Sequence, residues 1–163
     1  MNMFDLSGKI ALVTGGAHSI GFALGLGLAK AGATVCFNCS SEESRQRGVA
    51  AYAAEGVEVH GYVADVTDEA AIQALVAKIR EEVGIIDILV NNAGIIKRIP
   101  MAEMSVEDFT KVIDVDLVAP FICAKAVIPG MLEKGHGKII NICSMMSELG
   151  RETVSLTLLL RAA

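Results

Sequence analysis

The sequence predicts an α/β protein built on a doubly wound parallel sheet, and three observations support this fold class. Residues 9–21 read KIALVTGGAHSIG, a β-branched and aliphatic run followed by a glycine-rich turn and then a helical pattern. Strand-like and helix-like segments then alternate along the chain with short connections. Hydrophobic residues make up 53% of the chain but aromatic residues only 4%, as expected for aliphatic strands buried on both faces. Right-handed crossovers between such strands predict the sheet order 3-2-1-4-5.

The first part of the chain is expected to hold three strands and two helices. Gly32 follows the first helix and Gly56 follows the second, as is typical of helix ends. The first helix also contains Gly21, Gly25 and Gly27, poor helix formers that make sense where a helix lies close to a sheet or a ligand. The predicted elements are strand 9–13, helix 20–30, strand 33–38, a helix from 40 or 41 to 54, and strand 57–64.

The remaining elements are two more helices and two more strands. Thr67 is expected to cap a helix with an apolar stripe within residues 72–79. Ser105 and Asp108 form a variant capping box that opens a long helix, which Pro120 should bend. This helix should fade over 129–134, and the predicted strands are 85–90 and 138–143.

Composition limits the class of partner. The chain has 163 residues, enough for one domain with a real core, and its net charge of −5 argues against nucleic acid or an anionic membrane as a partner. No apolar run approaches the roughly 20 residues that a membrane span needs. The N-terminus carries Asp5 and no basic segment before an apolar one, so we expect no secretory signal and a cytoplasmic protein.

The cysteines raise the question of redox or zinc chemistry. Cys36 and Cys39 have C-x-x-C spacing, but Cys36 lies inside a strand-like run. No second pair, from Cys123 and Cys143, is spaced to complete a zinc site. We therefore expect small, mostly buried cysteines in a reduced compartment, and no metal site.

The glycine-rich turn is the first candidate functional element. Small residues let the backbone approach a pyrophosphate, and the N–H groups and dipole at a helix start favour negative charge. Strand, glycine turn and helix together open a dinucleotide-binding unit. Many strand–helix turns use glycine for geometry alone, so the turn needs support from the rest of the chain.

That support comes from four motifs that all fall at predicted strand ends. Together they resemble the short-chain dehydrogenase/reductase family, over Phe4 to about Ser155, and within it the gluconate 5-dehydrogenases. The resemblance implies a Rossmann-type fold that binds NAD or NADP. The motifs are Thr14-Gly15 with Gly21, Asp65-Val66, Asn91-Asn92-Ala93-Gly94, and Ile140 to Ser144 (INICS).

The resemblance assigns the pyrophosphate to the turn. Gly15, Ile20 and Gly21 would line it, and Thr14 would bond the turn that leads to Asn91. Ser19 stands where the family usually has its middle glycine, so its hydroxymethyl group should crowd the phosphates.

The other cofactor contacts follow the later strands. Asp65 would accept from the adenine amino group and Val66 would donate its N–H, although Asp65 can also be a capping or loop carboxylate. Asn92, Ala93 and Gly94 would form a floor for the nicotinamide ribose, or else a plain turn.

The residues after the second strand determine the preference between NAD and NADP, because a carboxylate there repels the 2′-phosphate of NADP. Residues 38–41 read NCSS, without acid or base, and Ser40 can donate to a phosphate, which favours NADP. Arg45 or His18 would add charge there, or each is a solvated surface residue.

The resemblance also places the catalytic groups. Ser144 matches the serine that orients the substrate oxygen, or it is simply a strand-end hydroxyl. Asp116 stands at the position of an asparagine that holds a proton-relay water, unless it is a solvated helix residue. The positions of the catalytic Tyr and Lys are Thr157 and Arg161, which cannot replace a phenol and an ammonium group. Tyr52 and Tyr62, which lie in earlier elements, cannot substitute either.

Residues 156–163, LTLLLRAA, have no polar face and no cap. A family-like Ala-Tyr-Ala-Ala-Ala-Lys-Gly-Gly, coded GCT TAC GCT GCT GCT AAG GGC GGC, reads Leu-Thr-Leu-Leu-Leu-Arg-Ala-Ala once its first base is deleted. We therefore expect a partial NAD(P)-binding domain over 1–155 and an out-of-frame, truncated tail over 156–163.

Two functions are consistent with these residues. The first is an oxidoreductase that interconverts a sugar acid such as D-gluconate and its 5-keto form, and the intact relatives commonly form homotetramers. The second is a non-catalytic NAD(P)-binding remnant, because the given chain lacks the Tyr and Lys.

Overall fold

The computed structural model describes residues 4–144, and within them the predicted parallel sheet is present in the predicted order β3-β2-β1-β4-β5. Positions Thr157 and Arg161 and the expected tail 156–163 lie outside these residues. The strands are β1 (Ile10–Thr14), β2 (Thr34–Cys39), β3 (Val59–Val63), β4 (Ile88–Asn91) and β5 (Lys138–Asn141). The α-helices are α1 (Ser19–Lys30), α2 (Glu42–Ala54), α3 (Glu69–Glu82), α4 (Val106–Ile113) and α5 (Ala119–Lys134).

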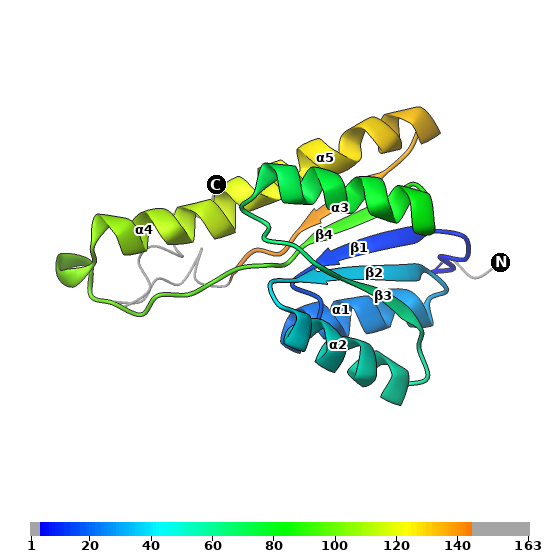
Figure 1. Ribbon diagram of the computed structural model, residues 1–163, viewed down its shortest axis with the longest axis horizontal. Coiled ribbons are helices and arrows are strands. Elements are labelled where there is room, and N and C mark those ends of the chain that lie inside the picture. The colour runs from blue at the N-terminus through cyan, green and yellow to red at the C-terminus, as the bar shows by residue number, and fades with distance from the viewer. Residues whose placement is uncertain (1–3, 145–163) are drawn as a thin grey trace.

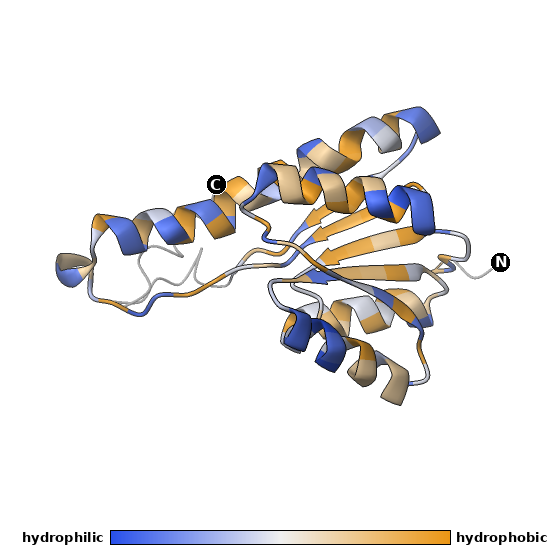
Figure 2. Ribbon diagram, viewed as in Figure 1, coloured by the Kyte–Doolittle hydropathy of each residue, from blue (hydrophilic) through white to orange (hydrophobic). Residues whose placement is uncertain are grey.

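Helices cover both faces of the sheet, with α1 and α2 on one side and α3 and α5 on the other (Figure 1). The strands are mostly hydrophobic, while hydrophilic residues gather in the N-terminal part of α2 and toward the C-terminal end of α3 (Figure 2). One core joins Leu12, Cys36 and Leu89 to α3 and α5, and another joins Ala11, Val13 and Val90 to α1. The three inner strands β1, β2 and β4 are therefore buried on both faces, as is typical of a parallel sheet, whereas the edge strands β3 and β5 are more exposed.

The register brings the carboxyl ends of the strands to one edge of the sheet. Thr14 lies beside Asn38 in the β1–β2 pair, and Asn38 lies beside Tyr62 in the β2–β3 pair. On the other side, Asn91 of β4 lies beside Asn141 of β5. In open α/β sheets this edge is where ligands bind.

The long helix begins as the capping pattern predicted. The Ser105 Oγ accepts the Asp108 N–H at 3.0 Å and donates to the Asp108 carboxylate, also at 3.0 Å. The helix then widens into η2 (Asp114–Val118), a π-helical turn just before Pro120. It continues past Pro129 as regular α-helix to Lys134 rather than fading, and Gly135 closes it at φ 73°.

The run Val106–Lys134 is long and apolar enough to cross a membrane, contrary to the expectation from the sequence. Length and composition alone are weak evidence, since core helices pass the same test. Here Ile122, Cys123, Val127 and Met131 are buried in the core that α3 and the sheet share. One apolar face of α5 therefore packs against the sheet, while a second apolar face, which includes Phe121 and Leu132, is exposed.

Several predicted boundaries and caps need correction. The α3 N-cap is Asp68, whose carboxylate accepts the Ala71 N–H at 3.1 Å, and not Thr67. Gly27 has open space around it, so its presence in α1 has no packing reason, whereas a side chain at Gly25 would overlap Tyr52. The strand predicted over 57–64 is limited to 59–63, that over 85–90 begins at Ile88, and that over 138–143 ends at Asn141.

Cys36 and Cys39 lie in different cores, Cys36 with α3 and α5 and Cys39 with Phe37 and Tyr52. Burial raises the pKa of the Cys36 thiol to about 12, which makes it inert. The described cysteines are all unpaired thiols, and no group of metal-ligating side chains was found among residues 4–144.

At the amino-terminal edge of the sheet, Asp87 forms hydrogen bonds that connect β1, α5 and β5. Its carboxylate accepts the Ile10 N–H at 2.9 Å and both oxygens lie 2.9 Å from Lys134 Nζ, while its side chain is only 3% exposed. Its main-chain N–H donates to Ile10 and its carbonyl accepts from Lys138. Burial alone would raise the pKa of this carboxyl, but the Ile10 N–H and the Lys134 ammonium outweigh burial and hold the pKa below its ordinary value.

We expect Asp87→Asn to lower the free energy of unfolding by about 1.5–3 kcal/mol at pH 7, because a buried charge-assisted contact is lost. The carboxylate of the parent protein stabilises the fold fully above the ordinary aspartate pKa, and this contribution is lost as the pH falls through the lower folded-state pKa. Urea unfolding at pH 7 and near pH 3 measures both effects. Glu55→Gln, which breaks the exposed Lys30–Glu55 pair, is the control and should cost less than about 1 kcal/mol. An equal loss in both variants would contradict the role of Asp87.

Candidate functional site

A cavity of about 540 Å³ opens at the carboxyl edge of the sheet, between the turn after β1 and the loops after β2, β3 and β4. Every predicted cofactor-binding residue except Thr14 lines it, and so does Ser144. Asp116 does not line it, although its neighbour Val115 does. The predicted residues that the structure brings together there are Gly15, Ser19, Ile20, Gly21, Ser40, Asp65, Val66, Asn92, Ala93, Gly94 and Ser144.

Side chains from three neighbouring elements hold the backbone of the turn after β1. Asn38 of β2 accepts the Gly15 N–H at 3.2 Å, and its main-chain carbonyl accepts the Gly16 N–H at 3.2 Å. Asn92, after β4, donates to the Thr14 carbonyl at 3.0 Å and to that of Gly15 at 3.3 Å. Tyr52 of α2 donates its hydroxyl to the Gly16 carbonyl at 3.1 Å. The amide groups of this turn are thus occupied within the protein.

Thr14 supports the turn from below and does not face the cavity. Its Oγ1 accepts the N–H groups of Asn92 and Ala93, each at 3.0 Å, and lies 3.4 Å from the Val90 carbonyl. Its side chain therefore bonds the turn that follows Asn91 and fixes β1 to the loop after β4.

The N–H groups at the start of α1 are the donors left for an anion. The first helical hydrogen bond runs from the Phe22 N–H to the His18 carbonyl, so the N–H groups of Ser19, Ile20 and Gly21 precede the helical ladder. All three residues line the cavity. A side chain at Gly21 would overlap the Gly15 carbonyl and the Asn92 amide, so only glycine lets the helix start approach the turn.

Ser19 has a backbone conformation that favours glycine. Its φ is 51°, and it is the non-glycine residue with positive φ among residues 4–144. This left-handed conformation costs roughly 1 kcal/mol for a residue with a Cβ. Its side chain is exposed at the cavity with the hydroxyl 3.2 Å from His18 Nδ1. The strain at Ser19 and its position agree with the expectation that it replaces a glycine.

Asp65 forms a local loop as well as part of the cavity wall. One carboxylate oxygen accepts the Thr67 N–H at 2.9 Å and the Thr67 hydroxyl at 2.7 Å. These hydrogen bonds from Thr67 lower the pKa of Asp65, so its carboxylate is ionised at neutral pH. The residue is exposed at the cavity, so its role as a loop carboxylate and a role in adenine binding are compatible.

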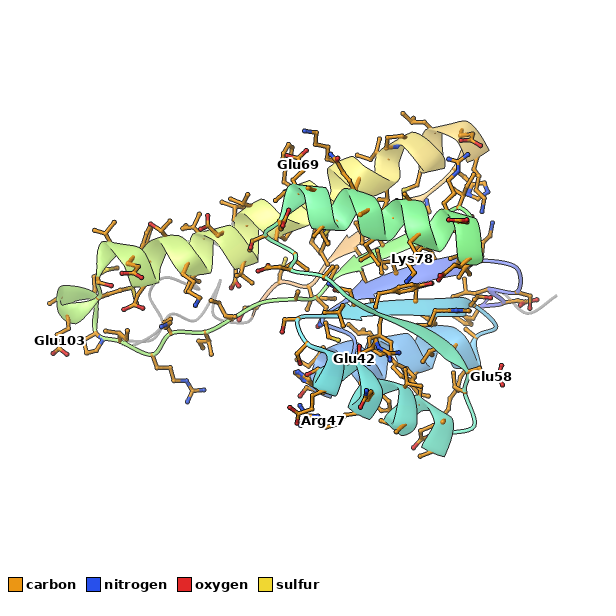
Figure 3. All side chains as sticks on the ribbon, viewed as in Figure 1. Glu42, Arg47, Glu58, Glu69, Lys78 and Glu103 are labelled. Carbon is orange, nitrogen blue, oxygen red and sulfur yellow. The ribbon has the colours of Figure 1, made fainter. Side chains whose placement is uncertain are left out.

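The end of β2 carries hydroxyl groups and a nearby imidazole. Ser40 and Ser44 line the cavity together with His18, and Asp65 is the acidic residue among the described lining residues. Arg45 does not line it, because its guanidinium pairs with Glu42 along α2, with a 2.8 Å contact from Nε. Glu42 is labelled on α2 in Figure 3. Of the two basic residues considered from the sequence, only His18 therefore lies at the cavity.

Asp116 lies in the π-helical turn and is not a solvated helix residue. Its Oδ1 accepts the Ile95 N–H at 2.9 Å. This contact holds the loop after Gly94 against the long helix, where Ile95 also packs beside Val112. The structure thus gives Asp116 a role in positioning the cavity floor.

The two tyrosines do not contribute a phenol to this cavity. Tyr52 donates to Gly16 and its burial raises the pKa of its hydroxyl to about 12. Tyr62 donates to Glu82 at 2.9 Å, and burial followed by that carboxylate raises its pKa. Neither lines the cavity that contains Ser144.

Asn38 and Tyr52 are the residues that the sequence interpretation missed. Asn38 is 1% exposed and ends an otherwise apolar run, TVCFN, which is the signal that marks it as a buried polar group with partners. Tyr52 is fully buried, and a tyrosine on a helix in a chain with few aromatic residues is a weaker signal.

Comparison with known proteins settles the family. A family profile described as short chain dehydrogenase matches residues 9–156. The chain belongs to this family. It is 53% identical over 155 residues to a 2-dehydro-3-deoxy-D-gluconate 5-dehydrogenase of Formosa agariphila, covering 94% of this chain and 59% of the relative. The chain thus spans about three fifths of the length of such relatives.

Solved structures of the family agree in fold. A 2-keto-3-deoxy-D-gluconate dehydrogenase from Streptococcus agalactiae is 59% identical with a TM-score of 0.83, over 96% of this chain and 59% of that one. A gluconate 5-dehydrogenase from Burkholderia cenocepacia, in complex with NADP and tartrate, is 40% identical with a TM-score of 0.90, over 98% of this chain and 63% of that one.

The residues present fit a dinucleotide. The cradle has a glycine where a Cβ would overlap the turn, three N–H groups at a helix start, and a cavity that continues past the ends of β2 and β3. Bound there, a nicotinamide dinucleotide would supply hydride transfer.

We expect Gly21→Ala to lower the free energy of unfolding by about 1–3 kcal/mol and to weaken NADPH binding, because the added methyl group overlaps backbone atoms of the turn. Gly27→Ala in the same helix is the matched control. Its methyl group meets nothing within 4 Å, so it should raise stability by about 0.5–1 kcal/mol through helix propensity. Thermal unfolding and fluorescence titration with NADPH measure both variants. Similar behaviour of the two variants would contradict the cradle.

Proposed function

We propose that this chain binds NAD(P) in the cavity at the carboxyl edge of its sheet, as the cofactor half of an oxidoreductase that acts on a sugar acid. The cradle formed by Gly21 against the clamped turn is the observation that carries this proposal. It provides the close backbone approach and the helix-start N–H groups that a pyrophosphate requires.

We propose NADP as the preferred cofactor. Ser40, Ser44 and His18 give hydroxyl and imidazole donors beside the end of β2, and no carboxylate follows that strand before Glu42. A carboxylate there would select NAD by repelling a 2′-phosphate. The NADP complex of the Burkholderia relative supports the same preference.

The proposed substrate is a six-carbon sugar acid that is oxidised at its 5-hydroxyl or formed by reduction of a 5-ketone. The names of the relatives support this class, since they act on gluconate or on its 2-keto-3-deoxy form. Ser144, at the cavity after β5, would hold the substrate oxygen by its hydroxyl. Asp116 would hold the loop that forms the floor.

We propose a cytoplasmic protein that contacts neither nucleic acid nor membrane, in agreement with the charge of −5. An exposed apolar stripe along η2 and α5 supports subunit contacts of the kind expected for a homotetramer of the complete enzyme. Its members are Leu117, Phe121, Ile128 and Leu132.

We expect the 163-residue chain to bind NADPH more tightly than NADH but to show no turnover, because its sequence places no phenol within reach of Ser144. Fluorescence titration with each cofactor tests binding. Absorbance at 340 nm with D-gluconate or 2-keto-3-deoxy-D-gluconate tests turnover. A complete relative, such as the Formosa enzyme, is the positive control. Absence of binding would refute the cofactor proposal, while measurable turnover would overturn the non-catalytic assignment.

We also propose that the reading frame changes after Ser155 by loss of one base. The family match ends at residue 156, which supports this position. Sequencing the gene across the Ser155 codon is the direct test. Restoring one base should give an open frame that begins Ala-Tyr and continues with family-like sequence, whereas an unrelated translation would reject the frame change.

A further inference from the structure

We infer that Asn38 is a positioning residue whose side-chain amide joins Gly15 to Ala64 and so sets the distance between the two halves of the cofactor site. The phosphate turn is residues 14–16, and the adenine loop is residues 64–66. This inference rests on the proposed binding of a dinucleotide, and it adds a residue whose task is to couple the subsites.

The strand register places Asn38 between the two loops. β2 lies between β1 and β3, and Asn38 is level with Thr14 on one side and Tyr62 on the other. Its Oδ1 accepts the Gly15 N–H at 3.2 Å, and its Nδ2 donates to the Ala64 carbonyl at 2.9 Å. One short, buried side chain therefore spans the gap between the turn and the loop.

The chemistry of the two partners selects an amide. Gly15 offers a donor and the Ala64 carbonyl an acceptor, so the bridging group must carry one acceptor and one donor at fixed separation. The network also fixes the orientation of the amide, since a flipped Asn38 would oppose donor to donor and acceptor to acceptor. A carboxylate lacks the donor, and an aliphatic side chain leaves both backbone groups without this partner.

The distance between the phosphate turn and the adenine loop matters because the proposed cofactor contacts both. In the proposed complex the pyrophosphate lies at the turn and the start of α1, while the adenine lies at Asp65 and Val66. A ligand that spans both subsites binds well only when their spacing matches its own length, as in any linked pair of sites. Loss of the Asn38 bridge should therefore weaken a spanning ligand more than a ligand that fills one subsite.

The test uses the full chain, with calorimetry for three probes. ADP spans both subsites, adenosine binds at the adenine loop, and inorganic pyrophosphate binds at the start of α1 beside the turn. Asn38→Leu, near in size and without charge, should raise the Kd of ADP by about 10-fold or more. The Kd values of adenosine and pyrophosphate should each change by less than about 3-fold.

Val35→Ala is the matched control for general destabilisation. Val35 is fully buried in the same strand and does not line the cavity. This variant should lower the melting temperature but leave the ratio of the three Kd values unchanged. A merely structural role of Asn38 would give the same result for both variants and would overturn the inference.

A measurement on the unaltered protein covers the case in which Asn38→Leu does not fold. Adenosine binding at residues 64–66 should slow hydrogen exchange of the Gly15 amide, since Asn38 links the two. An unchanged Gly15 exchange rate in adenosine-saturated protein overturns the inference. If the unaltered protein binds none of the three probes, the proposed function itself fails. If it binds ADP but Asn38→Leu binds all three probes as before, only the coupling by Asn38 is rejected.

Discussion

The clamped glycine turn after β1 is the constraint on which the rest of this site depends. Its carbonyl and N–H groups are hydrogen-bonded by Asn38 of β2, by Asn92 in the loop after β4, and by Tyr52 of α2. A buried backbone group without a hydrogen-bond partner would destabilise the fold by about 1–3 kcal/mol. The hydrogen bonds from these three side chains avoid this penalty in a turn that is shielded from water. They also fix its position relative to three separate elements.

In this arrangement, the groups that hold the turn in place differ from the groups that are available to bind a ligand. The N–H groups of Gly15 and Gly16 are occupied inside the protein, so an anion meets the helix-start N–H groups of Ser19 to Gly21. Gly21 is needed because the helix start lies against the Gly15 carbonyl. Ser19 keeps the backbone conformation of a glycine at a cost near 1 kcal/mol and adds a hydroxyl at the cavity. In the proposed complex the glycine turn is therefore a scaffold, and the start of the helix binds the phosphate groups.

The sequence predicted the fold well because its main signals are local. Periodicity and glycine positions predicted the elements and their order, and nearly all of the predicted cofactor-binding residues line the cavity. The missed features depend on contacts between distant segments. In the sequence, Asn38 is a single polar residue at a strand end. Its hydrogen bonds to Gly15 and Ala64 form only when β1 and β3 pair with β2 on either side. The resemblance places Asp116 at a water-holding position, but its contact with the Ile95 N–H forms only when the loop carrying Ile95 folds against the long helix.

The proposed cofactor-binding turn and the proposed catalytic residue Ser144 lie on different parts of the sheet. The side chains that hold the turn come from β2, from the loop after β4 and from α2. The turn itself follows β1, which has a hydrogen-bonded strand on either side. The residues after β5, Ile142 to Ser144, line the cavity, and the Ile142 N–H donates to the Asn91 carbonyl at 2.9 Å. All four residues of β5 are exposed, including Ile139 and Ile140, within the part of the chain described. Among the described residues β5 is an edge strand that pairs with β4, while the turn after β1 is held from both sides.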